Sequence, residues 1–154
     1  MKVGAMSNPA KGSEDVQRAI AEHAAMSEFV RNLDEAVGIW KTSEPSARIH
    51  RIRSFLQKHV TEHFALEDEK VFPALLDTCA DATTSRTIRG LQLDHKQIHQ
   101  EASQLKELLR KAEGNGELQL MAEVESSFRV LLGRLQRHAA VEDKLFAALA
   151  AQKR

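Results

Sequence analysis

Histidine and glutamate recur four residues apart in this chain, a spacing that could bind a metal ion. His59, His63 and Glu67 follow one another in steps of four. In an α-helix of about 3.6 residues per turn, side chains four apart lie one above the other on the same face. Two imidazoles and a carboxylate would then point in one direction, and both are ligand types that transition metals accept.

Three other segments offer the same residue types. His138 and Glu142 are again four apart, and each of the two His-x-x-x-Glu motifs continues with aspartate and, a few residues later, phenylalanine. One further segment carries two histidines at this spacing, and another carries a single histidine. The seven candidate metal ligands are His23, His63, Glu67, His95, His99, His138 and Glu142.

Apolar residues at helical spacing predict four amphipathic helices that would position these side chains. We expect these helices at residues 14–40, 46–72, 84–113 and 117–152. Pro73 should kink or end the second helix, because proline lacks a backbone donor. Three prolines and seven glycines in 154 residues also suit an all-α fold. Short connections favour an antiparallel up-down-up-down four-helix bundle, with residues 1–12 as a flexible tail and 13–154 as one domain.

Counted from the expected turns, the candidate ligands fall at similar heights in such a bundle. Seven polar groups buried in one layer would exhaust the roughly 5–15 kcal/mol stability of a domain unless something neutralises them. Metal cations do so directly. Seven side chains are too many for one tetrahedral zinc ion, and they suit two metals that share bridging carboxylates.

Composition excludes several other classes of function. The 22 basic and 22 acidic residues balance, so no strong field attracts nucleic acid or an anionic membrane. No apolar run approaches the roughly 18 residues of a membrane span. Cys79 is the only cysteine, which excludes an intramolecular disulfide and suits a reducing compartment, so we expect a cytoplasmic protein.

The ordered set of motifs resembles the hemerythrin family, and specifically its hemerythrin-like HHE cation-binding domains. The resemblance covers about residues 14–149 and is carried by His23, by His63 to Pro73, by His95 with His99, and by His138 to Asp143. It implies a four-helix bundle around a non-haem di-iron centre with a bridging oxygen species. Under that resemblance Glu67 and Glu142 would be the bridging carboxylates, and His23, His63, His95, His99 and His138 the terminal ligands.

Three details stay open at this point. In some family members the last carboxylate is an aspartate five residues after its histidine, here Asp143, but Glu142 lies on the apolar stripe and we favour it. His59 is either an alternative ligand or a residue that fixes the tautomer of a ligand. Zinc or another divalent metal is the alternative to two iron ions.

The resemblance implies a protein that binds O2 or another small diatomic ligand, for oxygen binding, storage or sensing. One alternative is an iron, redox or nitric-oxide stress protein that uses the same site, and another is a metal-binding signalling module. We expect a binding protein rather than an enzyme, present as a monomer or small homo-oligomer, with neither nucleic acid nor membrane as a partner.

Overall fold

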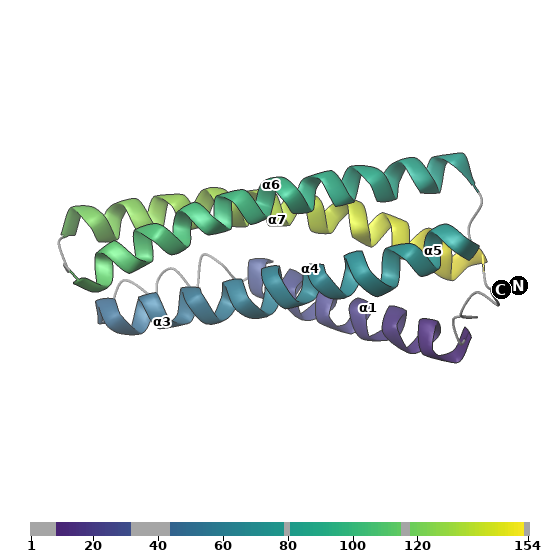
Figure 1. The fold of residues 1–154 in the computed structure, drawn as a ribbon, viewed down its shortest axis with the longest axis horizontal. Coiled ribbons are helices and arrows are strands. Elements are labelled where there is room, and N and C mark those ends of the chain that lie inside the picture. The colour runs from purple at the N-terminus through teal and green to yellow at the C-terminus, as the bar shows by residue number, and fades with distance from the viewer. Residues whose placement is uncertain (1–8, 32–43, 79–80, 115–117, 153–154) are drawn as a thin grey trace, which may run out of the picture.

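The computed structural model describes residues 9–31, 44–78, 81–114 and 118–152, and these are helical apart from Glu44 and Asp81 at two helix starts. They form four helical rods (Figure 1). The first, third and fourth rods are single helices: α1 (Pro9–Arg31), α6 (Ala82–Gly114) and α7 (Leu118–Gln152). The second rod is continuous through α3 (Pro45–Phe55), η1 (Leu56–Glu62), α4 (His63–Leu66), η2 (Glu67–Val71) and α5 (Phe72–Thr78). The predicted all-α class is therefore confirmed for the described residues.

The helix boundaries follow from local chemistry. Pro45 occupies the first turn of α3, where its missing N–H would have no helical partner anyway. Asp81 caps α6, since its side-chain oxygen accepts a hydrogen bond of 2.9 Å from the backbone N–H of Thr83. The first helix begins at Pro9, earlier than predicted, and the last part of its predicted range, residues 32–40, lies outside the described residues.

The second rod does not stop at Pro73, contrary to one of the two predicted outcomes. It continues to Thr78, and the wider π-helical turns of η2 come directly before the proline. The carbonyl that would pair with the absent N–H of Pro73 belongs to Glu69, within η2, where the regular hydrogen-bond ladder is already interrupted. The widened turns therefore let the helix pass the proline.

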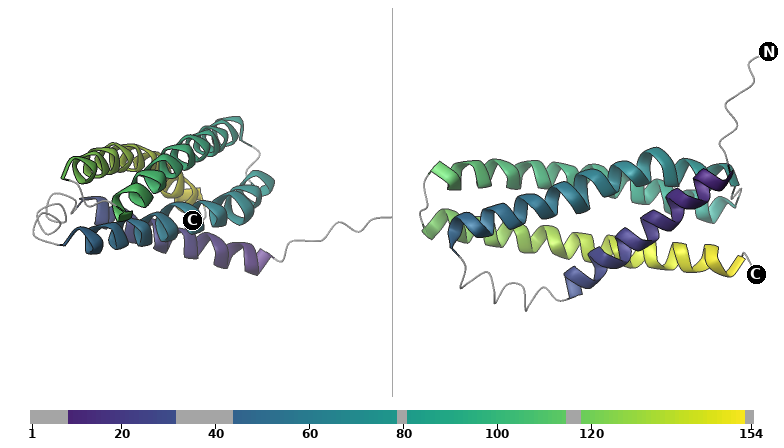
Figure 2. Two further views of the ribbon diagram at one scale, coloured as in Figure 1. Left: turned by 60° about the vertical axis from the view of Figure 1, so that its left-hand side comes forward. Right: turned by 90° about the horizontal axis from the view of Figure 1, so that it is seen from below.

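The apolar core consists of two clusters on either side of a polar layer. The larger cluster contains residues of the second rod up to Phe64, of α6 from Ile98 onward, and of α7 up to Ala139. The smaller cluster includes Ala19, Val71, Phe72, Leu75, Ile88, Leu91, Leu145 and Phe146. Figure 2 shows the second rod, α6 and α7 running side by side, with α1 alongside one half of the bundle, and α1 contributes to the smaller cluster through Ala19. Among the described residues, no helix is long and apolar enough to cross a membrane.

This division of buried and exposed positions predicts how leucine substitutions affect stability. Leu132 has no exposed surface, whereas Leu93 is 65% exposed, and both lie inside helices. Leu132→Ala should lower the free energy of unfolding by about 2–5 kcal/mol through lost burial and a cavity, measured by chemical denaturation. Leu93→Ala is the matched control and should change it by less than about 0.5 kcal/mol. Equal effects would contradict the described core.

Candidate metal centre

The polar layer between the two apolar clusters consists of six buried residues, and every rod contributes at least one. Each is at most 4% exposed, although charged and polar side chains normally lie at the surface. The six residues are His23 of α1, His63 and Glu67 of the second rod, His95 of α6, and His138 and Glu142 of α7.

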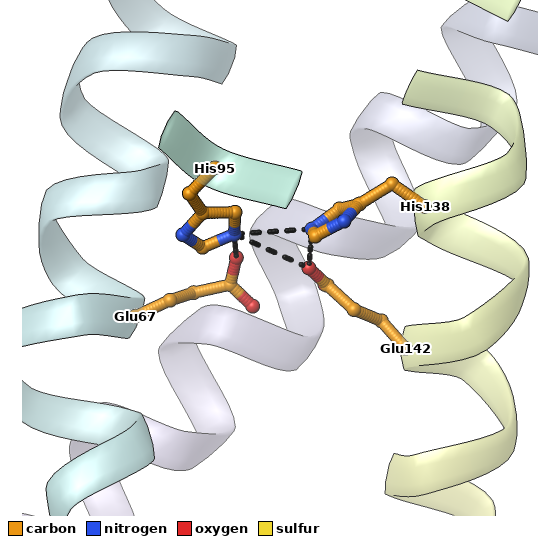
Figure 3. Close-up of side chains that lie close together, drawn as sticks. All are labelled: Glu67, His95, His138 and Glu142. Carbon is orange, nitrogen blue, oxygen red and sulfur yellow. Dashed lines mark hydrogen bonds and ion pairs between the residues drawn. The ribbon is translucent and has the colours of Figure 1, made fainter. Parts of the chain in front are cut away.

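Four of these side chains converge between the second rod, α6 and α7 (Figure 3). The Nε2 atoms of His95 and His138 lie 3.0 Å apart. Glu67 Oε1 is 3.3 Å from His95 Nε2, and Glu142 Oε1 is 2.5 Å from His138 Nε2. Within this first cluster, one candidate ligand atom from each residue lies within 4.8 Å of the others.

A second cluster joins His23, His63 and the same Glu142. His23 Nδ1 lies 3.1 Å from Glu142 Oε2, whereas the closest contact of His138 Nε2 is with Oε1 of the same carboxylate. His63 Nε2 in turn lies 3.4 Å from Glu67 Oε1. The two carboxylates therefore stand between two groups of imidazoles, and Glu142 belongs to both.

The buried atoms at the centre lack the hydrogen bonds that such atoms need. Both side-chain oxygens of Glu67 and of Glu142, together with His63 Nε2, have no partner in hydrogen-bonding geometry, although imidazole nitrogens approach to ion-pair distance. An unsatisfied buried polar group costs about 1–3 kcal/mol, and more when it is charged. Their donor set of nitrogen and carboxylate oxygen fits a transition-metal cation, which would satisfy these lone pairs together.

The outward-facing nitrogen of each imidazole meets a further carboxylate at the rim of the layer. A carboxylate only accepts hydrogen bonds, and therefore the outward-facing nitrogen carries the proton. The inner nitrogen can then present a lone pair. The four contacts are Glu22 to His63 Nδ1 at 3.1 Å, Asp68 to His95 Nδ1 at 2.9 Å, Asp94 to His138 Nδ1 at 3.2 Å, and Asp143 to His23 Nε2 at 2.5 Å. Sequence reasoning did not identify Glu22, Asp68 or Asp94. The available signal was that each is the chain neighbour of a candidate ligand.

Local structure and aromatic packing hold the inward-facing groups in place. His63 and Glu67 lie where the second rod alternates between α-helical and wider π-helical turns, a feature common at functional sites. The ring of Phe64 stacks on His95 with centroids 3.8 Å apart and planes 8° apart. Phe72 packs near the same imidazole, with a centroid distance of 5.5 Å. These rings limit the orientations open to His95.

Three sequence candidates lie outside both clusters. His99 is half-buried, one helical turn from His95, with its ring edge against Phe64 at 5.5 Å, so the structure does not bring it to the other six. His59 is half-buried and packs against Phe55 at 5.0 Å. Asp143 is 61% exposed in its side chain and contacts His23 from outside, whereas Glu142 is fully buried.

Comparison with known families agrees with this geometry. A family model described as the hemerythrin HHE cation binding domain matches residues 14–150. The chain belongs to this family. Searches with the chain matched neither a curated protein nor a solved structure. Membership supports a metal-binding helical domain, and the cluster of histidines and glutamates is the place in this HHE domain where a cation fits.

Without metal, several buried groups of this HHE domain have pKa values far from their ordinary ones. Burial disfavours the charged form of His95, but contacts with Asp68, Glu142 and Glu67 outweigh it and raise the pKa of the imidazole to about 11. Burial likewise opposes protonation of His23, but its two carboxylate neighbours raise the pKa to about 9. Protons therefore take the place of metal cations among the carboxylates.

The two buried glutamates shift in opposite directions. Burial, reinforced by the charge of Glu142, raises the pKa of Glu67 to about 8 against the opposing effect of His95. Burial also acts to raise the pKa of Glu142, but three surrounding imidazoles outweigh it and hold the pKa well below its usual range. Glu142 is thus kept ionised by the neighbouring imidazoles, whereas Glu67 is held neutral until above pH 7.

These shifts predict the pH dependence of the metal-free protein. His23, His95 and Glu67 have raised pKa values in the fold, so between pH 6.5 and 9 the folded chain binds more protons than the unfolded chain. Stability should therefore fall across this window, by about 1.4 kcal/mol per pH unit for each extra bound proton. Urea unfolding of chelator-treated protein at pH 7 and pH 9 measures this effect.

The metal-loaded protein is the control for this pH dependence. Metal binding requires neutral imidazoles and ionised carboxylates, so the metal's stabilising effect should grow over the same pH range. A metal-free protein whose stability stays constant or rises from pH 7 to pH 9 would contradict the described contacts.

Proposed function

We propose that this chain is a non-haem di-iron protein that binds O2 or another small diatomic ligand. Glu67 and Glu142 would bridge the two ions, and His23, His63, His95 and His138 would complete the ligand set. We also propose the antiparallel up-down-up-down arrangement for the bundle. The observation that carries the proposal is the position of Glu142, whose two oxygens face two different groups of imidazoles.

The sharing of Glu142 favours two ions over one. Its Oε1 lies beside His138 and its Oε2 lies beside His23, so a single ion would leave one of these buried pairs unneutralised. Two carboxylates carry less charge than two divalent cations, and this excess of positive charge favours additional anionic or electron-rich ligands. The site therefore suits ions that bind an exogenous molecule.

The donor count also leaves coordination positions open. Four imidazoles and two carboxylates supply at most about eight donor atoms, fewer than two octahedral ions accept. A di-ferrous pair, when bound, supplies the electrons for reversible O2 binding. The protein contributes the fixed ligand directions and the apolar walls on both sides of the layer, which limit access of water and protons.

A surface groove borders one residue of the layer. It lies between α6 and α7 and has a volume of about 140 Å³. His138 lines this groove and also belongs to the first cluster, so a molecule in the groove reaches a residue of the centre. The other lining residues are Asp94, Gln97, Ile98, Arg134, Arg137 and Val141.

Metal analysis followed by anaerobic titration tests the proposal. The purified protein should contain about two irons per chain, and O2 added to the reduced protein should produce new visible absorption that disappears when O2 is removed. A single zinc without iron uptake would refute the di-iron centre. Irreversible colour change with O2, together with tight reversible binding of nitric oxide, would favour a nitric-oxide or redox role at the same site.

Substitution of the shared carboxylate should affect both ions together. Glu142→Gln keeps the size of the side chain but removes the charge between the two clusters, so we expect metal content to fall from about two ions to less than one per chain. Glu123→Gln removes a charge from an exposed position of the same helix and should leave the metal content unchanged. Retention of both ions by Glu142→Gln, measured by elemental analysis, would refute the shared-ligand assignment.

A further inference from the structure

The four rim carboxylates form a closed cycle around the bundle. Glu22 of α1 contacts His63 of the second rod, and Asp68 of the second rod contacts His95 of α6. Asp94 of α6 contacts His138 of α7, and Asp143 of α7 contacts His23 of α1, which closes the cycle. Each rod thus gives one carboxylate to the next rod and receives one from the rod before it.

Helical geometry explains how such a cycle arises from chain neighbours. Each rim carboxylate is adjacent in sequence to an inward-facing residue, and adjacent residues are about 100° apart around a helix. A side chain next to an inward-facing one therefore points sideways, toward the neighbouring rod.

The order along the chain alternates in a way that fits the proposed topology. Glu22 and Asp94 precede their inward neighbours, whereas Asp68 and Asp143 follow theirs. Because all the helices are right-handed, a preceding residue on a rod that runs up and a following residue on a rod that runs down point in the same sense around the bundle. Four contacts in one rotational direction are therefore what an antiparallel arrangement produces.

We propose that Glu22, Asp68, Asp94 and Asp143 are positioning residues for the metal ligands. Each carboxylate accepts the outer N–H of one imidazole, fixes its tautomer and makes its inner nitrogen a better donor. This inference rests on the proposed metal centre, but it concerns residues outside the ligand set. It assigns the carboxylates a role beyond that of surface ion pairs, which contribute little to stability.

The exposure of the four carboxylates suits this role. Their side chains are 31% exposed for Glu22, 37% for Asp68, 49% for Asp94 and 61% for Asp143. Each therefore remains partly hydrated and avoids most of the cost of burying a charge, while one oxygen still reaches a buried nitrogen. The layer gains orientation without additional buried charge.

The cycle contains one difference that makes the inference specific. At His63, His95 and His138 the rim carboxylate contacts Nδ1, which leaves Nε2 facing the centre. At His23 the rim carboxylate contacts Nε2, and Nδ1 faces Glu142. The geometry therefore assigns metal binding to Nδ1 of His23 and to Nε2 of the other three imidazoles.

Two substitutions and two matched controls test the positioning role. Glu22→Gln and Asp94→Asn remove rim charges on different rods. Glu62→Gln alters an exposed residue that is the chain neighbour of His63 but lies outside the cycle, and Asp77→Asn alters an exposed aspartate of α5. The affinity for Fe(II), measured anaerobically by chelator competition, should fall roughly 10- to 100-fold in the first two variants and less than about twofold in the controls.

Nitrogen NMR of the histidine rings in Zn(II)-loaded protein shows which ring nitrogen of each histidine is protonated. A purely structural role of the rim carboxylates would leave these signals unchanged. The unsubstituted protein should show protonated Nδ1 at His63, His95 and His138, and protonated Nε2 at His23. In Asp94→Asn, the proton signal of His138 should shift and exchange faster with water, while the signals of the other three remain.

The outcomes separate this inference from the proposed function. An unsubstituted protein that binds neither Fe(II) nor Zn(II) would refute the metal centre itself. If that protein binds metal, equal affinities in rim and control variants, or an unchanged His138 signal in Asp94→Asn, would refute the positioning role alone. Circular dichroism and the melting temperature of each metal-free variant verify that the fold is intact, and Glu22→Gln supplies an independent measurement on another rod.

Discussion

Two carboxylates with no exposed surface, placed among imidazoles, are the constraint on which the rest of this structure depends. An ionised carboxylate loses several kcal/mol of hydration on burial, and the loss is recovered only if positive charge lies in direct contact. Every rod supplies part of that compensation, because no single helix can surround an oxygen atom. The four rods must therefore meet at one height, and the bundle cannot shift its register without separating buried charges from their partners.

The apolar residues have a different task from the polar layer. They supply the driving force for packing, and they surround the layer so that its histidines keep a single orientation, as the stacking of Phe64 on His95 illustrates. In the second rod, His63 and Glu67 lie beside the π-helical turns of η1 and η2 and between the two apolar clusters. Glu67 and Glu142 are buried, whereas the carboxylates at the rim stay partly hydrated. Six carboxylates can therefore lie close together without all being buried.

The sequence predicts the all-α class and the approximate helices, because apolar spacing and the scarcity of proline and glycine are local properties. Spacing also indicates which residues share a face, so the amino-acid sequence pairs His63 with Glu67 and His138 with Glu142. It does not indicate depth along a helix, which is why His99 shared the predicted face of His95 but lies a turn away from the centre. Glu22, Asp68 and Asp94 resemble ordinary surface charges in sequence, and only the positions of neighbouring rods reveal their contacts with histidine.

The division of the core by a polar layer has a consequence for how the chain unfolds. Each apolar cluster packs within itself, and the two clusters are connected by the continuous helices and by the charged layer between them. Cations at that layer would fasten all four rods at a single cross-section and make the halves one cooperative unit. Without them, unpaired buried polar groups weaken this cross-section, so amide hydrogen exchange at the middle of the bundle would be faster in the metal-free protein than in the metal-loaded one.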